Sequence, residues 1–140
     1  MSRPVETFAP GIAFRVLIVD DHAIIREGIR FLLSRQPQWE VCGEAANGRE
    51  AVEKVQELKP DIVVLDLSMP VMNGVEAARE IRKISPGTKI VILTLHGAAQ
   101  AATMTQDSAV DAIVEKREAA NALTETMERL LENHFVSRRG

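Results

Sequence analysis

The chain has 140 residues, of which 46% are hydrophobic and 26% are charged, with a formal net charge of −3 at pH 7. This length suits one domain with a single core, and the apolar content excludes an intrinsically disordered protein. The small negative charge gives no indication of a nucleic-acid-binding surface. The lone cysteine, Cys42, excludes an internal disulfide and lacks the partners for a zinc site, so we expect it to be a small buried residue.

No apolar run has the length of a membrane span, and the N-terminus lacks the charged and then apolar pattern of a signal peptide. We therefore expect a soluble, cytoplasmic protein with no membrane partner. Residues 1–11 contain two prolines, a glycine and no hydrophobic periodicity, which predicts a disordered leader.

The first two strands are predicted on either side of an amphipathic helix. Residues 14–19 form an apolar run that predicts a buried strand, and the run ends at Asp20 and Asp21. Residues 22–36 repeat apolar side chains with helical spacing and stop before a proline, which predicts a helix. Residues 39–46 predict a weaker strand.

A second helix is predicted to begin at Asn47, which has the chemistry of a helix N-cap. Glu50 follows three residues later, so the pair resembles a capping box in which Glu50 reaches back to the main chain of Asn47. The helix is predicted to end before Pro60.

The next apolar run, residues 62–65, is predicted to be the central strand of the sheet. Four consecutive β-branched or bulky apolar residues are typical of a strand buried on both faces. The run ends at Asp66, and turn-forming residues follow: Ser68, Pro70, Asn73 and Gly74. An aspartate at the C-terminal end of a central parallel strand can bind a metal or act as a nucleophile. An aspartate that caps the following turn is the alternative.

The remaining segments continue the alternation of helix and strand. In order, the sequence predicts a helix over 74–85, a strand over 89–93 ending at Thr94, a poorly striped helix over 98–108, a strand over 110–114 followed by Lys116, and an amphipathic helix over 118–133. Five repeats of strand and helix predict an α/β protein with one doubly wound parallel sheet and helices on both faces.

Chemically related side chains follow four of the predicted strands. The C-terminal ends of parallel strands meet at one edge of a sheet, so Asp20, Asp21, Asp66, Thr94 and Lys116 are expected to converge. Three crowded carboxylates repel one another unless a cation is bound, and oxygen ligands suit Mg²⁺. A lysine and a threonine hydroxyl can hold the oxygens of a phosphoryl group, which Asp66 could accept to give an aspartyl phosphate.

These residues resemble the signature of a known family. The segments Val19-Asp20-Asp21-His22 and Leu65 to Gly74, together with Thr94 and Lys116, resemble the motifs of response-regulator receiver domains. The segment that begins at Leu17 and continues through the first helix is similar to the NarL/FixJ subgroup. The resemblance covers about residues 14–133, so we expect a receiver domain over 12–133. Residues 134–138 resemble the start of a linker, so we expect the start of a linker or a tail over 134–140.

The resemblance implies a flavodoxin-like (βα)₅ fold and a site that uses Mg²⁺ as cofactor. It implies four residues for the metal: Asp20, Asp21, Asp66 and the backbone carbonyl of Ser68. Asp66 would be the phosphoacceptor, Lys116 would contact the phosphoryl group, and Thr94 would reorient toward it. The donor would be a phosphohistidine on a sensor histidine kinase or a phosphotransfer protein, and the chain would be a signalling protein rather than an enzyme.

The sequence departs from the family pattern near the fifth strand. Arg117 stands where the family has a proline after the lysine, and Ile113 stands where the family has an aromatic residue. Residues 108–110 replace a run of small residues. These departures concern the switching output rather than the phosphate chemistry.

Several other functions remain open at this point. The sequence is compatible with a stand-alone or switch-impaired receiver that acts through protein contacts or as a homodimer. An aspartate-nucleophile phosphatase is less favoured, because that class needs an acid where Ser68 stands. A flavin-binding domain is also less favoured, because Asp20 and Asp21 would repel its phosphate. We expect an excised receiver of a transcriptional regulator, whose DNA contacts would come from a helix-turn-helix domain that these residues do not include.

Overall fold

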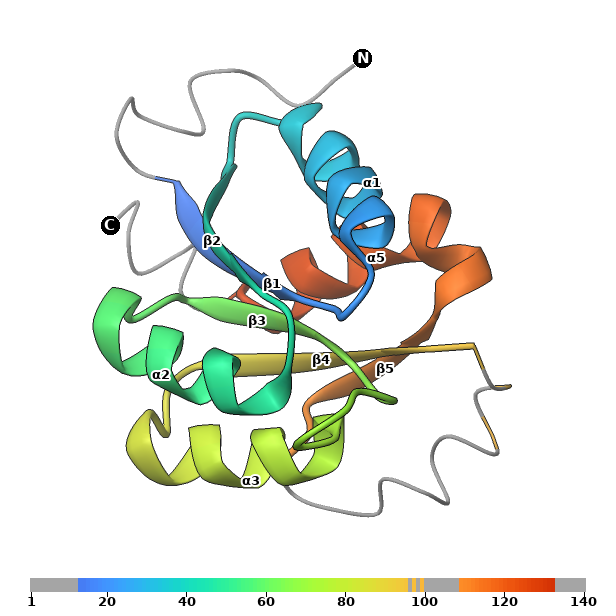
Figure 1. The fold of residues 1–140 in the computed structure, drawn as a ribbon. Helices are drawn as coiled ribbons and strands as arrows, with labels where there is room; N and C mark the ends of the chain where they lie inside the picture. Colours follow the sequence, from blue (N-terminus) through green and yellow to red (C-terminus); the bar gives the residue numbers. More distant parts are fainter. Residues whose placement is uncertain (1–12, 96, 98, 100–108, 133–140) are drawn as a thin grey trace.

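The computed structural model describes residues 13–95, 97, 99 and 109–132 (Figure 1). Its elements, in chain order, are β1 Phe14–Val19, α1 Ala23–Ser34, β2 Trp39–Ala45, α2 Gly48–Leu58, β3 Ile62–Asp66, α3 Gly74–Ile84, β4 Lys89–Thr94, β5 Ala112–Glu115, the 3₁₀ helix η2 Lys116–Glu118 and α5 Ala119–Leu130. The five strands form one parallel sheet in the order β2-β1-β3-β4-β5. The predicted doubly wound, flavodoxin-like sheet is confirmed.

The sheet lies between two layers of helices. Helices α1 and α5 cover one face, and α2 and α3 cover the other (Figure 1). Each face has its own core: Leu33 of α1 and Met127 of α5 belong to one, and Val55 of α2 and Ile81 of α3 to the other. All five residues of β3 are buried, because a central strand is covered on both faces. The sheet therefore offers its strand ends, rather than its faces, for chemistry.

The fifth strand begins later than the sequence predicts. The expected range was 110–114, whereas β5 runs over Ala112–Glu115. The carboxylate of Asp111 accepts a hydrogen bond from the main-chain N–H of Ile90 at 2.7 Å. That side-chain oxygen occupies the donor on β4 that a carbonyl of β5 would otherwise use, so the ladder starts at Ala112.

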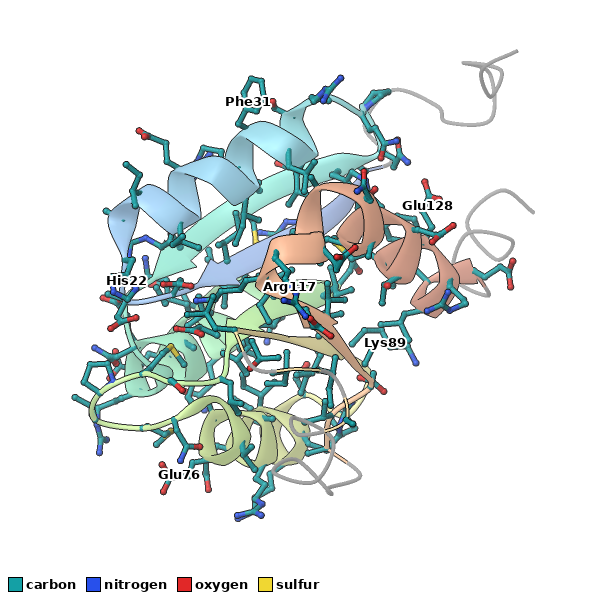
Figure 2. The ribbon with its side chains drawn as sticks, turned by 90° about the vertical axis from the view of Figure 1, so that its right-hand side faces the viewer. His22, Phe31, Glu76, Lys89, Arg117 and Glu128 are labelled. Atoms are coloured by element: carbon teal, nitrogen blue, oxygen red, sulfur yellow. The ribbon has the colours of Figure 1, made fainter. Side chains whose placement is uncertain are left out.

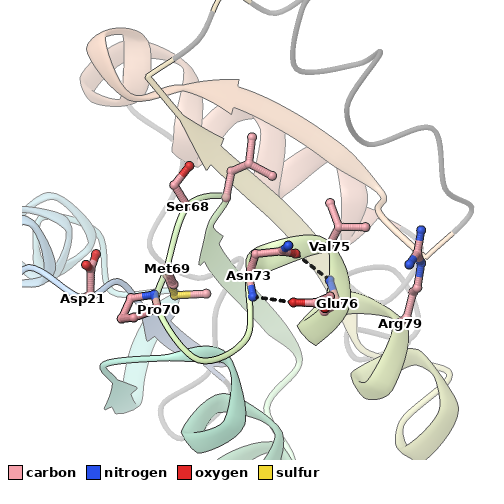
Figure 3. Close-up of a pocket in the computed structure, with 9 residues that line it drawn as sticks. Asp21, Ser68, Met69, Pro70, Asn73, Val75, Glu76 and Arg79 are labelled. Atoms are coloured by element: carbon pink, nitrogen blue, oxygen red, sulfur yellow. Dashed lines mark hydrogen bonds between the residues drawn. The ribbon is translucent and has the colours of Figure 1, made fainter.

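The capping box is also assigned differently from the prediction. Asn47 does cap α2 by accepting the N–H of Glu50 at 2.9 Å, but the carboxylate of Glu50 binds the N–H of Ala46 instead of that of Asn47. The full reciprocal box stands at the start of α3, between Asn73 and Glu76, with both hydrogen bonds drawn in Figure 3. Both helices carry the same Asn-x-x-Glu spacing, and only the local turn decides which main-chain N–H the glutamate meets.

Two residues are less buried than the sequence predicts. Helical spacing places Ile84 on the apolar face of residues 74–85, but it is the last residue of α3 and its side chain is exposed. Cys42 is half-buried in the edge strand β2 rather than buried. The predicted helix over 98–108 falls almost wholly outside the described residues. Among the residues that the structure describes, no helix is both long and apolar enough to cross a membrane.

Candidate functional site

Four strand ends bring the expected side chains to one edge of the sheet. Asp20 follows β1 and is fully buried, Asp66 is the last residue of β3 and is 4% exposed, and Thr94 ends β4 and is buried. The strand register aligns these ends, since Val19 pairs with Leu65 in the neighbouring strand. The structure therefore brings the carboxylates together, as the βα order predicted.

Lys116 joins two of the carboxylates. Its Nζ atom lies 3.0 Å from Oδ2 of Asp20 and 3.0 Å from Oδ1 of Asp66, and its side chain is 13% exposed. The Lys116–Arg117 peptide is trans, and the Arg117 guanidinium turns away to donate to Glu115 at 2.9 Å. The lysine thus reaches the acids without a following proline, because the 3₁₀ helix η2 begins at Lys116 itself. Ile113 lies half-buried against the core below α2 and α3.

The buried acid and the buried base shift each other's pKa. Burial raises the pKa of the Asp66 carboxyl, the hydrogen bond from Lys116 opposes that rise, and the nearby charge of Asp20 adds to it. Burial acts to lower the pKa of Lys116, but hydrogen bonds to Asp20 and Asp66 outweigh it, so the pKa of the lysine is raised. The lysine stays charged, while Asp66 is a carboxylate whose ionised form is poorly solvated.

Two carboxylate oxygens at this edge fit a hard cation. Asp20 Oδ2 and Asp21 Oδ1 are both buried, and in the part of the chain that the structure describes no main-chain N–H binds either atom; Lys116 Nζ lies 3.0 Å from Asp20 Oδ2. His22 Nδ1 lies 3.3 Å from Oδ1 of Asp20 and 3.1 Å from Oδ1 of Asp21, and Figure 2 shows His22 at the N-terminal end of α1. One lysine does not neutralise three crowded carboxylates, and buried carboxylates are costly unless a cation binds them. With Asp66 beside them, these acids fit a divalent metal such as Mg²⁺.

The loop after Asp66 is built to pass close to the strand. A Cβ added at Gly74 would lie 2.5 Å from the carbonyl oxygen of Asp66, so only glycine fits there. Val71 has a φ of 71°, and the N–H of Met72 donates to the carbonyl of Pro70 at 2.7 Å, which makes a tight γ-turn. This turn folds the loop back along the edge of the sheet.

A pocket of about 620 Å³ opens beside this loop. It is lined by Asp21 at one end, by the loop in the middle and by Arg79 of α3 at the other end (Figure 3). Ser68, which the family resemblance names as a metal ligand through its carbonyl, lines the same pocket and is exposed. The pocket therefore gives a ligand in solution access to the acidic edge.

One pair of contacts at the site was not foreseen from the sequence. The Arg26 guanidinium on α1 donates to the carbonyl of Asp20 at 2.6 Å and to the carboxylate of Glu44 on β2 at 2.9 Å. Helical spacing places Arg26 off the apolar face of the helix predicted over residues 22–36 and indicates no partner for it. Arg26 and Glu44 are 18 positions apart in the sequence, and their contact depends on how β2 lies beside β1. A local sequence pattern does not predict such a contact.

Comparisons with known proteins identify the class to which this fold and site belong. The family model of the response regulator receiver domain matches residues 16–128. The chain belongs to this family, whose members act in two-component signalling, and the resemblance seen in the motifs is confirmed.

Its relatives include response regulators, among them the transcriptional regulatory protein DegU of Brevibacillus brevis, which is 38% identical over 82 residues, covering 59% of this chain and 35% of DegU. The response regulator protein VraR of Staphylococcus epidermidis is 40% identical over 125 residues, covering 89% of this chain and 60% of VraR. The chemotaxis protein CheY of Thermotoga maritima is 53% identical over 83 residues, covering 59% of this chain and 68% of CheY. A two-component response regulator of the LuxR family from Aurantimonas sp. matches with a TM-score of 0.80 and 36% identity, covering 86% of each chain. The chain thus spans about 60% of the length of VraR.

Proposed function

We propose that this receiver domain accepts a phosphoryl group on Asp66 from the phosphohistidine of a sensor histidine kinase or a phosphotransfer protein. The observation that carries the proposal is the buried Asp66 carboxylate, held 3.0 Å from Lys116 Nζ beside a second buried acid, Asp20. A nucleophile, a fixed cation and a set of metal-binding oxygens at one strand edge are the parts that phosphoryl transfer needs.

In the proposed reaction, an oxygen of Asp66 attacks the phosphorus atom of the donor. The new O–P bond makes an acyl phosphate, the N–P bond to the donor histidine breaks, and the electron pair stays on the imidazole nitrogen. Lys116 neutralises charge on the phosphoryl oxygens, and the hydroxyl of Thr94 donates to one of them. Mg²⁺ held by Asp20, Asp21, Asp66 and the Ser68 carbonyl would neutralise further charge on those oxygens.

We propose transcription regulation in the cytoplasm as the output of this signal. DegU of Brevibacillus brevis supports it, since its name describes a transcriptional regulatory protein. DNA contacts would then come from a helix-turn-helix domain outside these residues, and phosphorylation would act through the receiver's contacts with that domain or with a second copy.

Labelling with a small phosphodonor and Mg²⁺ tests the assignment of Asp66. The parent should take up a phosphoryl group that hydroxylamine removes, as an acyl phosphate requires, and Asp66→Asn should take up none, since an amide does not attack. Asp111→Asn is a matched control, because it removes an aspartate from the opposite edge of the sheet. Label on Asp66→Asn would contradict the proposal and make Asp20 the next residue to test.

A further inference from the structure

Arg26 ties the main chain of Asp20 to two other elements. Its Nη1 donates to the Asp20 carbonyl at 2.6 Å, and its Nε donates to Oε1 of Glu44 at 2.9 Å. Its own N–H donates to the carbonyl of His22 at 3.1 Å. The guanidinium is largely buried, and it therefore joins α1, the turn after β1 and the edge strand β2 through geometrically fixed hydrogen bonds.

A β-bulge in β2 puts Glu44 within reach of this arginine. The pairing with β1 passes from Val41 to the second residue after it, so Cys42 is the extra residue. Before the bulge, Val41 packs against the core below α1, and after it Ala45 packs in the core below α2 and α3. Side chains alternate along a strand, so Glu44, next to Ala45, faces α1 and Arg26.

The carbonyl that Arg26 binds belongs to the peptide unit between Asp20 and Asp21. This unit is planar, so fixing its oxygen also fixes the direction in which Asp21 leaves the strand. On the other side of Asp20, its N–H donates to the carbonyl of Ala45 at 3.1 Å. The peptide units on both sides of the Asp20 Cα are thus held on β2, one by Ala45 directly and the other by Arg26 and Glu44. These hydrogen bonds therefore set the orientation of Asp20 and Asp21.

Arg30 provides an internal comparison, because it binds the same glutamate from the next turn of α1. Its Nε donates to Oε2 of Glu44 at 2.8 Å, and its side chain is more exposed than that of Arg26. Burial acts to raise the pKa of Glu44, but hydrogen bonds from Arg30 and Arg26 outweigh it, so the pKa is lowered and the glutamate is anionic. Arg26 and Arg30 share this partner, and it is Arg26 that donates to the main chain of Asp20.

We propose that Arg26, held by Glu44, is a positioning residue that sets the Mg²⁺ affinity of the site, an inference that rests on the proposed function. It does not touch the metal or the phosphoryl group. It keeps the Asp20–Asp21 peptide in the orientation that presents both carboxylates, so that binding does not have to order them. Loss of Arg26 leaves all ligands in place, but part of the binding free energy is then used to order the two carboxylates, so the Mg²⁺ affinity falls.

The test is a Mg²⁺ titration of the unphosphorylated protein, followed by amide chemical shifts in NMR spectra. Arg26→Met keeps the apolar stem of the side chain and should weaken Mg²⁺ binding by roughly tenfold. Arg30→Met removes a guanidinium from the same glutamate and should leave the dissociation constant unchanged. Glu44→Gln should weaken binding less than Arg26→Met, because Arg26 keeps its bond to the Asp20 carbonyl; this variant also tests the proposal if Arg26→Met does not fold.

A kinetic measurement separates positioning from general loss of structure. With a small phosphodonor, Arg26→Met should need more Mg²⁺ for half-maximal phosphorylation and reach the parent's rate at saturation. Arg26→Lys, which keeps one charged donor, should recover part of the affinity. Equal Mg²⁺ affinity in the parent, Arg26→Met and Glu44→Gln would overturn this inference while leaving the proposed function intact. A parent that binds no Mg²⁺ would overturn the metal site of the proposed function itself.

Discussion

Aspartates stand at both edges of the parallel sheet, but their carboxylates bind different partners at the two edges. At the N-terminal edge, Asp61 precedes β3 and accepts the N–H of Arg15 at 2.8 Å, and Asp111 precedes β5 and accepts the N–H of Ile90 at 2.7 Å. Each of these aspartates also donates its own N–H to the carbonyl of the same partner, at 2.9 Å. Their carboxylates complete the ladder between neighbouring strands.

At the C-terminal edge, the aspartates do not complete the ladder. Asp20 and Asp66 are more deeply buried than Asp61 and Asp111, yet their carboxylates face each other across Lys116 instead of accepting an N–H of a neighbouring strand. The buried Oδ2 of Asp20 and Oδ1 of Asp21 have only cation or imidazole contacts within the described ranges: Lys116 Nζ lies 3.0 Å from Asp20 Oδ2, and His22 Nδ1 lies 3.1 Å from Asp21 Oδ1. Aspartates whose oxygens accept main-chain N–H groups hold the fold together, whereas carboxylates crowded around one lysine mark the site of chemistry.

The largest effect on folding should come from removing an aspartate at the N-terminal edge. Asp111→Ala leaves the N–H of Ile90 without its acceptor and removes the carboxylate 2.6 Å from the Arg82 guanidinium, which keeps its main-chain acceptors. We expect a loss of about 2 kcal/mol in the free energy of unfolding, measured with urea. Asp111→Asn should lose less, because an amide oxygen still accepts the N–H. If Asp111→Ala were as stable as the parent, the aspartates at the N-terminal edge would not be needed to stabilise the fold.

Mg²⁺ should stabilise the protein through the C-terminal edge alone. At ten times its dissociation constant, a ligand that binds only the folded state adds about 1.4 kcal/mol, which appears as a higher Tm. Asp21→Ala should abolish this gain, and Asp111→Asn should keep it because it lies at the other edge. A gain of the same size in Asp21→Ala would show that Mg²⁺ binds elsewhere.

Neutralising Asp66 at the C-terminal edge should raise the free energy of unfolding, whereas removing Asp111 should lower it. Because burial raises the pKa of Asp66, the folded state binds its proton more tightly than the unfolded state. The stabilising contribution of this group is present below the ordinary pKa of 3.8 and is lost as pH rises through the raised value. Without Mg²⁺ at neutral pH, Asp66→Asn should therefore be more stable than the parent, since Lys116 keeps Asp20 as its partner. Urea unfolding at several pH values checks this, and a destabilised variant at neutral pH would contradict it.

The smallest effect on stability is expected at Glu44, near the C-terminal edge. Its carboxylate accepts hydrogen bonds from Arg26 and Arg30, as the carboxylates of Asp61 and Asp111 accept N–H groups at the other edge. Its pKa is lowered because the hydrogen bonds from Arg30 and Arg26 outweigh burial, so its contribution is present above 4.5 and is lost as pH falls through the lowered value. Glu44→Gln should cost about 0.5 kcal/mol at neutral pH, since the pair is partly exposed. The difference from the parent should disappear in acid, and a difference that grows as pH falls would have the wrong sign.

Much of this comparison could be predicted from the sequence, because it depends on local patterns. Continuous apolar runs predicted β1, β3 and β4, and acids directly after β1 and at the end of β3 predicted that Asp20 and Asp66 would meet. The start of β5 could not be predicted, because it depends on Asp111 capturing an N–H on the neighbouring strand. The link between Arg26 and Glu44 could not be predicted either, because a bulge in β2 decides which way the glutamate faces.

The central claim, that Asp66 is the phosphoacceptor, is tested most directly by locating the modified residue. The protein is incubated with a small phosphodonor and Mg²⁺ and then reduced with borohydride, which converts an aspartyl phosphate to homoserine. Peptide mass spectrometry then locates the homoserine. We predict homoserine at Asp66 in a Mg²⁺-dependent manner, and none at Asp61 or Asp111 at the opposite edge. Homoserine at Asp20 or Asp21, or an unmodified Asp66 in a protein that carries the phosphoryl group, would contradict this account.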